Sequence, residues 1–247
     1  MKNILFILIL MTSFITFGYA QRPDANAILA AIDKNMTSTS SRLSSRMVIH
    51  SRRASRTVAS INYSQGNNRF YAEYTDPPRE KGTKMLKLDD NLWIYEPSSD
   101  RTIQISGNML KQSVMGSDLS YEDFMEETSL ARAYNARITG EKVHDGRNCW
   151  IMELNAKSDN VSYPKRILYV DKERNIALYE ELYAKSGRLL KTTTSSDITR
   201  FGNRWYPKKI VFKDELKDGK GTEFIIDEIE FNIAIPERYF NRAALRK

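Results

Sequence analysis

The sequence predicts a mainly β protein in which a single curved antiparallel sheet of about eleven strands forms a half-open β-barrel covered by a few helices. Short segments of alternating apolar and polar residues follow one another along most of the chain. Tight turns join them without the βαβ rhythm of a parallel sheet, so successive strands are expected to pair as antiparallel hairpins. That many strands must curl to bury one face.

The first twenty residues have the pattern of a secretory signal peptide. Lys2 gives a positive start, residues 4–17 form an apolar run, and small residues lie at Gly18 and Ala20. Cleavage is therefore expected after Ala20, which places the mature protein in an extracytoplasmic space. The alternative is a membrane anchor, but the apolar run is short for spanning a bilayer.

The remaining chain, residues 21–247, is expected to form one domain, because no linker-like composition and no internal repeat divides it. Cys149 is the only cysteine, so an internal disulfide is excluded and a sizeable apolar core must hold the fold together. Its setting in a strand pattern favours a small buried residue. A reactive thiol is the alternative.

An N-terminal helix is expected to begin after Asp24, a preferred capping residue, and to run to Met36 with apolar residues at helical spacing. Asp76, Pro77 and Pro78 stop one of the strands that follow, since proline cannot donate to a central ladder. The predicted strands outside residues 82–124 are 47–50, 57–64, 68–75, 135–143, 149–156, 165–170, 176–183, 189–198, 205–213 and 223–232.

The stretch from Gly82 to Phe124 combines three strands with a different kind of segment. The first two strands are joined by Asp89-Asp90-Asn91, and a third follows the turn 96–100. After Gly107 the chain is rich in Met and Leu and poor in strand pattern. We expect a helical flap over about 108–130, with a helix from Tyr121 to Ala133, that closes an apolar cavity on the concave face of the sheet.

Ten apolar or aromatic residues are the candidates for lining a lipid-binding cavity. Methionine suits this role because its flexible side chain conforms to irregular ligands. Trp93 and Tyr95 are two residues apart and point the same way, either into the cavity or under the helices. For each candidate the alternative is ordinary core packing. The ten are Met85, Trp93, Tyr95, Met109, Leu110, Val114, Met115, Leu119, Phe124 and Met125.

Two motifs resemble those of the LolA-like outer-membrane lipoprotein-sorting proteins, a group that includes the lipoprotein carriers LolA and LolB. The first is Asn91-Leu92-Trp93-Ile94-Tyr95-Glu96-Pro97, preceded by Asp76-Pro77-Pro78 and Gly82. The second is the block from Gly116 to Phe124, GSDLSYEDF. The order of helix, strands, flap and further strands agrees with the resemblance over essentially the whole mature chain.

The resemblance implies a half-open β-barrel closed by helices, an apolar cavity for acyl chains, and a periplasmic protein that transfers a lipidated cargo between membranes. It also suggests a loading partner, an inner-membrane transporter complex. The lid-latching arginine of the carriers precedes a proline. The corresponding stretch here, Gln65 to Phe70, has no proline, so Arg69 is not assigned that role.

The net charge of +7 is moderate, and five arginines lie close together near the mature N-terminus: Arg42, Arg46, Arg52, Arg53 and Arg56. An exported protein without a nucleic-acid-binding motif is not expected to bind nucleic acid. The arginines favour transient contact with an anionic membrane or an acidic partner. A solvated strand face is the alternative.

Nothing in the sequence has the pattern of a catalytic, metal or cofactor site. His50 and His144 are far apart and are interpreted as surface residues. Glu122, Asp123, Glu126 and Glu127 are interpreted as the solvated face of the flap helix rather than as paired catalytic carboxylates. No hydrolase elbow, phosphate loop or zinc motif is present. We therefore expect neither an enzyme nor a cofactor.

The function predicted from the sequence is that of a monomeric periplasmic carrier. It would sequester the acyl chains of a lipid or lipoprotein and shuttle this cargo toward the outer membrane. The alternative is a periplasmic sensor or binding module that recognises acylated ligands and acts through a membrane partner. An enzyme acting on lipid or glycan is the third class considered.

Overall fold

The computed structural model describes residues 23–51, 54–159 and 161–246. The expected signal peptide, its cleavage site after Ala20, and the arginines Arg52 and Arg53 lie outside these residues. No helix in the described ranges is both long enough and apolar enough to cross a membrane.

The described residues contain one antiparallel sheet of 13 strands in the order β6-β5-β4-β3-β2-β1-β13-β12-β11-β10-β9-β8-β7. The strands are β1 (Ser40–His50), β2 (Ser55–Gln65), β3 (Arg69–Asp76), β4 (Lys84–Leu88), β5 (Asn91–Glu96), β6 (Arg101–Ile105), β7 (Tyr134–His144), β8 (Arg147–Ala156), β9 (Lys165–Asp171), β10 (Ala177–Tyr183), β11 (Leu189–Phe201), β12 (Arg204–Asp214) and β13 (Thr222–Phe231).

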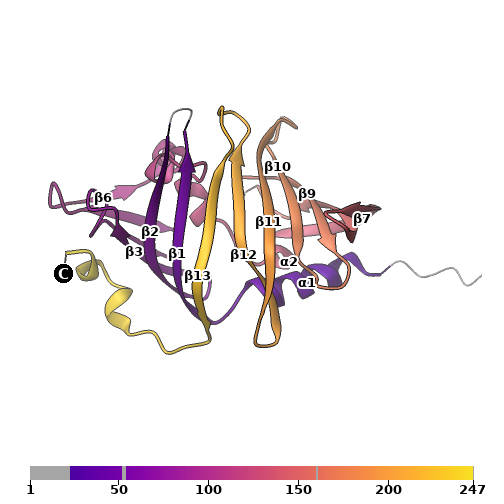
Figure 1. The fold of residues 1–247 in the computed structure, drawn as a ribbon, viewed down its shortest axis with the longest axis horizontal. Coiled ribbons are helices and arrows are strands. Elements are labelled where there is room, and N and C mark those ends of the chain that lie inside the picture. Colours follow the sequence, from indigo (N-terminus) through magenta and orange to yellow (C-terminus); the bar gives the residue numbers. More distant parts are fainter. Residues whose placement is uncertain (1–22, 52–53, 160, 247) are drawn as a thin grey trace, which may run out of the picture.

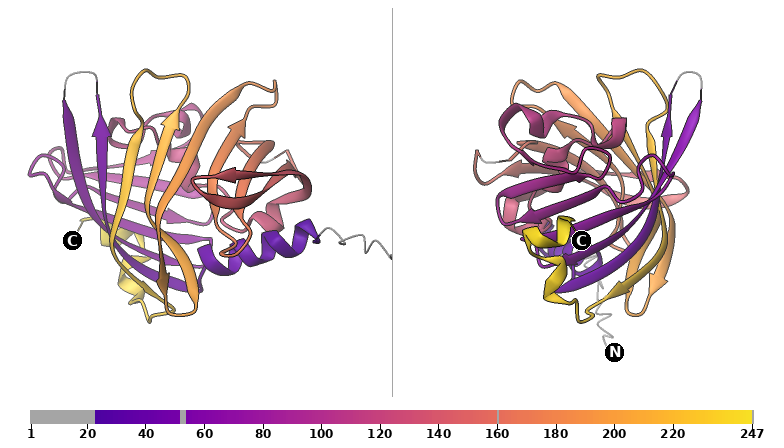
Figure 2. Two further views of the ribbon diagram at one scale, coloured as in Figure 1. Left: turned by 45° about the vertical axis from the view of Figure 1, so that its right-hand side comes forward. Right: turned by 90° about the vertical axis from the view of Figure 1, so that its left-hand side faces the viewer.

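The predicted fold class is confirmed: the sheet is strongly curved and its two edge strands, β6 and β7, do not pair with each other. Figures 1 and 2 show the central strands β1, β13, β12 and β11 side by side; together they form the middle of the half-barrel wall. The sheet within the described residues has 13 strands; this equals the number of strand segments that the sequence pattern marks, although the expected sheet has only about eleven strands. All neighbours in the sheet except β1 and β13 are consecutive in sequence, as the hairpin turns require.

Helix α1 (Ala25–Met36) is confirmed, and the carboxylate of Asp24 caps it by accepting a hydrogen bond from the amide of Asn26 at 2.9 Å. Its apolar face, with Leu29 and Ile32 at its centre, packs on β7, β8 and β9, where it covers Met152 and Leu168. The helix thereby closes one half of the concave face of the sheet.

The segment from 107 to 133 covers the other half of the concave face. It consists of the short 3-10 helices η1 (Gly107–Lys111), η2 (Val114–Gly116) and η3 (Tyr121–Phe124), followed by the four-residue helix α2 (Leu130–Ala133). The continuous helix predicted from Tyr121 to Ala133 is therefore wrong. η3 ends at its C-cap Met125, and the backbone is extended at Ser129 (φ −88°, ψ 107°), which caps α2, so the helical geometry is interrupted between the two. We refer to residues 107–130 as the flap.

The C-terminal segment, with η4 (Glu237–Tyr239) and η5 (Arg242–Arg246), runs along the opposite, convex face of the sheet (Figure 2). Phe240 and Leu245 are buried there against Tyr71 and Leu86. The ring of Tyr239 stacks on that of Tyr63, with centroids 4.2 Å apart. This second apolar layer holds the tail on the outside of the half-barrel.

Candidate functional site

Two adjoining cavities open inside the half-barrel, between α1, the end of the flap and the concave face of β9–β12. Their volumes are about 190 and 360 Å³. Thr128, Leu130 and Arg166 line both of them. The apolar part of the remaining wall comes from Ile32, Met36, Leu168, Ile176, Ala177, Leu182, Ile210 and Phe212. The charged part comes from Asp33 and Glu180 and, in the larger cavity, also from Asp123, Glu126, Glu127 and Lys191.

Eight of the ten predicted cavity residues lie in the flap half of the interior, where they pack tightly. Met85 is fully buried on β4, and the flap residues Met109, Leu110, Phe124 and Met125 pack on its cluster. Val114, Met115 and Leu119 form a second cluster over β1 and β2 with Met47 and Val58. The structure brings these eight residues together in packed clusters at the flap, and the open space lies beside them, over β9–β12.

The other two predicted residues, Trp93 and Tyr95, lie on the convex face. Met85 pairs with Ile94, whereas Leu86 pairs with Trp93, and neighbouring positions of a strand face opposite sides of the sheet. Trp93 and Tyr95 pack against the C-terminal segment with Leu86. The prediction that Trp93 and Tyr95 line the same cavity as Met85 is therefore wrong. The sequence left open whether Trp93 and Tyr95 face the cavity or pack under helices, and the structure shows them packed under the helical turns of the C-terminal segment.

Cationic side chains from several strands fasten the flap to the sheet. Lys87 on β4 is buried, and its ammonium donates to the carbonyl of Phe124 at 3.1 Å. Desolvation lowers the pKa of Lys87.

Lys191 on β11 is also buried and donates to the Ser120 hydroxyl at 2.8 Å and to the carboxylate of Asp123. Arg56 on β2 donates to the carbonyl of Met115. The flap is thus held by polar contacts from both halves of the sheet.

Arg166 on β9 is another buried cation, with 10% of its side chain exposed. Its guanidinium lies 3.0 Å from the carboxylate of Glu180, 3.2 Å from that of Glu126, and donates to the Tyr134 hydroxyl at 2.7 Å. Burial alone would lower the pKa of Arg166, but Glu180, Tyr134 and Glu126 outweigh it and raise the pKa. Arg166 therefore remains a buried cation that links the flap, through Glu126, to the cavity wall.

The interpretation of the flap acids as a solvated helix face is wrong for Asp123 and Glu126. Their side chains are 17% and 15% exposed and point to Lys191 and Arg166 in the interior. The inward cations were missed because each looks like an ordinary charged residue in a strand. The signal was present, since Lys87 and Arg166 lie two residues from Met85 and Leu168 and therefore share their faces.

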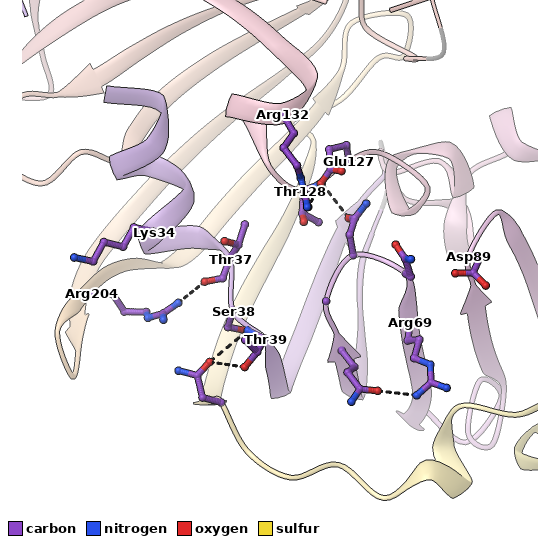
Figure 3. Close-up of a pocket in the computed structure, with 15 residues that line it drawn as sticks. Lys34, Thr37, Ser38, Thr39, Arg69, Asp89, Glu127, Thr128, Arg132 and Arg204 are labelled. Atoms are coloured by element: carbon purple, nitrogen blue, oxygen red, sulfur yellow. Dashed lines mark hydrogen bonds and ion pairs between the residues drawn. The ribbon is translucent and has the colours of Figure 1, made fainter. Parts of the chain in front are cut away.

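A polar vestibule of about 1010 Å³ opens at the end of the half-barrel where β2 turns into β3 (Figure 3). It lies between the connection from α1 to β1, the β2–β3 turn and the end of the flap. Arg69, the residue considered for a latch, lines this vestibule. Its guanidinium binds Gln65 and Glu237, both at 2.8 Å, and so ties the C-terminal segment to β3.

A fourth hollow of about 610 Å³ lies at the opposite end of the strands, between the flap and the β12–β13 connection. Leu119, Lys191 and Tyr163 contribute to it, and the last two also line the larger interior cavity. The interior therefore borders a hollow at each end of the half-barrel.

The remaining candidate residues for chemistry have structural surroundings. Cys149 is fully buried, and burial raises the pKa of its thiol, so the interpretation as a small core residue is confirmed. His50 pairs with Glu223 at 3.1 Å, and His144 packs beside the ring of Tyr169. Both histidines are half-buried rather than fully exposed. No group of three or more His, Cys, Asp or Glu side chains in the described ranges is placed to hold a metal ion.

A protein-family model described as "Uncharacterized protein" matches residues 66–247, which is most of the chain. The chain belongs to that family. A comparison with curated proteins found no match. The family description names no activity, so the fold must be placed by comparison with solved structures.

Three solved structures share the whole architecture and confirm the resemblance to the LolA-like fold. A domain named for outer membrane lipoprotein sorting, from Vibrio parahaemolyticus, has a TM-score of 0.77 at 21% identity and covers 90% of this chain and 98% of its own. A DUF1329 family protein from Desulfovibrio piger has a TM-score of 0.78 at 24% identity, covering 90% and 100%. A LolA superfamily protein from Nitrosomonas europaea has a TM-score of 0.72 at 22% identity, covering 90% and 99%. At these identities the likeness shows the LolA-like fold.

Proposed function

We propose that this protein is a periplasmic carrier that holds the acyl chains of a lipid or lipoprotein inside its half-barrel and shuttles this cargo toward the outer membrane. The observation that supports it best is the pair of adjoining interior cavities beside α1, the smaller of which is walled mainly by apolar side chains. The larger, at about 360 Å³, falls within the range of roughly 300–1,000 Å³ that small-molecule sites occupy. Burial of an acyl chain contributes about 0.8 kcal/mol per methylene, so such a space gives useful affinity without specific contacts.

The flap is proposed as the movable wall of this site. Its Met and Leu side chains rest on β1–β5 through apolar contacts that can separate and re-form, and methionine adapts well to such changes. When the flap moves, the residues predicted from the sequence would line an enlarged cavity: Met85, Met109, Leu110, Val114, Met115, Leu119, Phe124 and Met125. Loading by an inner-membrane transporter complex and transient membrane contact belong to the same proposal.

The carrier proposal is tested by titrating a fluorescent fatty acid into the purified mature protein and into the variant Ile210→Asp. Ile210 lines the smaller cavity on β12, and a carboxylate placed in apolar surroundings costs about 1–3 kcal/mol or more. We expect at least about tenfold weaker binding. The matched control is Val143→Asp, the same kind of change at a residue that is 65% exposed on β7. Circular dichroism checks that both variants fold.

Equal affinity of wild type and Ile210→Asp would contradict the placement of the acyl chain in this cavity. The flap is tested separately by Leu119→Asp, because Leu119 is 7% exposed and packs in the flap cluster over β1 and β2. This variant should take up less lipid while the sheet remains folded. Unchanged uptake by Leu119→Asp would remove the flap from the proposal and leave the cavity over β9–β12 in place.

A further inference from the structure

The polar vestibule at the β2–β3 turn differs in charge from the interior cavities. Four cationic side chains and two acidic ones line it: Lys34, Arg69, Arg132 and Arg204 against Asp89 and Glu127. The larger interior cavity has the opposite balance, with Arg166 and Lys191 against Asp123, Glu126, Glu127 and Glu180. An anionic group is therefore favoured in the vestibule and disfavoured in the interior.

The vestibule is also rich in groups that donate hydrogen bonds. The side-chain oxygen of Asn67 accepts from the amide of Thr128 at 3.0 Å, and that of Asn232 accepts from the Thr39 hydroxyl at 3.0 Å. This leaves both carboxamide NH₂ groups as donors. Within the described part of the chain, no hydrogen bond or ion pair of the Lys34 ammonium is found. Phosphate and carboxylate oxygens, which only accept, fit such a surface.

Two of the arginines are held in place, which makes the vestibule a formed site rather than a loose surface. Arg204 donates to the carbonyl of Thr37 at 2.6 Å and lies over the ring of Phe231, 4.3 Å from its centroid. Arg132 pairs with Glu127 at 2.8 Å although 66% of its side chain is exposed. Figure 3 shows Arg204 from β12 and Arg132 from α2 around one opening, together with Lys34 from α1 and Thr37 from its connection to β1.

The vestibule adjoins the interior cavities. Thr128 lines the vestibule and both cavities, and Glu127 lines the vestibule and the larger one. A ligand with a polar group in the vestibule can therefore extend an apolar chain past Thr128 toward Phe212. The charge difference between the two spaces gives such a ligand one orientation, with its anionic end outward.

We propose that the vestibule is a headgroup site that selects acylated amphiphiles with an anionic, phosphate-bearing headgroup. This proposal rests on the carrier function proposed above and adds the class of cargo to it. The acyl chain occupies the apolar cavities, and the phosphate oxygens accept hydrogen bonds from the cations and amides of the vestibule. A zwitterionic lipid with the same chains gains less, because its own cation meets Arg132, Arg204 and Lys34.

The test compares uptake of phosphatidylglycerol and phosphatidylcholine with identical acyl chains from mixed vesicles, measured by native mass spectrometry of the recovered protein. Wild type is expected to take up the anionic lipid several-fold more. The double variant Lys34→Glu/Arg132→Glu should lose this several-fold preference and keep its uptake of phosphatidylcholine. The matched control, Lys185→Glu/Lys220→Glu, reverses two exposed lysines at the other end of the strands and should keep the preference.

The remaining outcomes separate this proposal from the one it rests on. Equal uptake of both lipids by wild type, or an equal loss of preference in both double variants, overturns the headgroup site and leaves the carrier function intact. Absence of uptake of either lipid overturns both proposals. A last arm titrates glycerol 3-phosphate alone. Binding of this soluble ester as tightly as the lipid would show a site for free phosphate esters and overturn the lipid assignment.

Discussion

Replacing Arg166 with methionine should destabilise the protein strongly, because this change leaves two carboxylates without their partner inside the half-barrel. The guanidinium lies 3.0 Å from Glu180 and 3.2 Å from Glu126, and only 10% of the Arg166 side chain is exposed. Removing one partner of such a buried network costs about 3–5 kcal/mol. For a domain with about 5–15 kcal/mol of total stability, that is a large share.

The assay is urea unfolding at pH 7, followed by tryptophan fluorescence. The matched control is Arg137→Met on β7, where the guanidinium is 67% exposed and binds Glu153 at 2.7 Å. That exposed pair should contribute no more than about 1 kcal/mol. Combining Arg166→Met with Glu126→Gln and Glu180→Gln should recover part of the loss, since the uncompensated charges disappear. A loss for Arg166→Met no greater than for Arg137→Met would refute the reasoning.

Three further predictions concern other parts of the structure. Burial alone would raise the pKa of Asp171, but the ion pair with Arg147 and the hydrogen bonds from the backbone amides of Glu173 and Arg174 together outweigh it and lower the pKa. This carboxylate therefore stabilises the fold above about pH 4, and the contribution is lost as the pH falls below that value. In acid unfolding followed by circular dichroism, Asp171→Asn should show lower stability at pH 7 and a smaller further loss below pH ~4; a wild-type acid dependence in the variant would be inconsistent with this role. Trp93→Ala should lower the free energy of unfolding by about 1–3 kcal/mol and leave fatty-acid affinity unchanged, because Trp93 packs on the convex face; a clear loss of affinity without unfolding would place it at the site after all. Gly221→Ala should destabilise by more than about 2 kcal/mol in urea unfolding, since φ is +88° and the new Cβ would lie 2.5 Å from the carbonyl oxygen of Phe212; a stability equal to wild type would show that the loop relaxes without cost.

The architecture could be predicted because it depends on local patterns. Asp24 before an apolar helical period marks α1, and the turn 65–68 followed by alternating residues marks β2 and β3. Consecutive hairpins then leave one antiparallel order for most of the sheet. Within the described sheet, the pairing of β1 with β13 joins distant parts of the chain. A sheet of this width must curve to bury one face, and this curvature accounts for that pairing.

The flap and the site could be predicted only in part, because their structure depends on tertiary contacts. The apolar spacing of residues 121–133 suggested a helix, but the acids of that segment turn inward to Lys191 and Arg166 and hold short 3-10 turns instead. No local pattern shows which inward cation meets which acid. Likewise, Trp93 and Met85 are both apolar strand residues, and only the register of β4 against β5 places them on opposite faces.

The open cavity over β9–β12 was missed for a related reason. Its wall combines Met36 from α1 with Leu168 and Phe212 from strands far away in the sequence. Each of these residues has the ordinary pattern of core packing. The space between them exists because α1 and the flap each cover one half of the concave face and do not fill the region where they meet.

The most direct test of the carrier account is native mass spectrometry, with lipid extraction, of the mature protein purified from its own periplasm. The account predicts a bound species that carries acyl chains, either a diacyl lipid or a lipidated polypeptide, and its loss in Ile210→Asp. An empty protein that also fails to take up a fluorescent fatty acid would contradict the account and favour a module that binds protein partners.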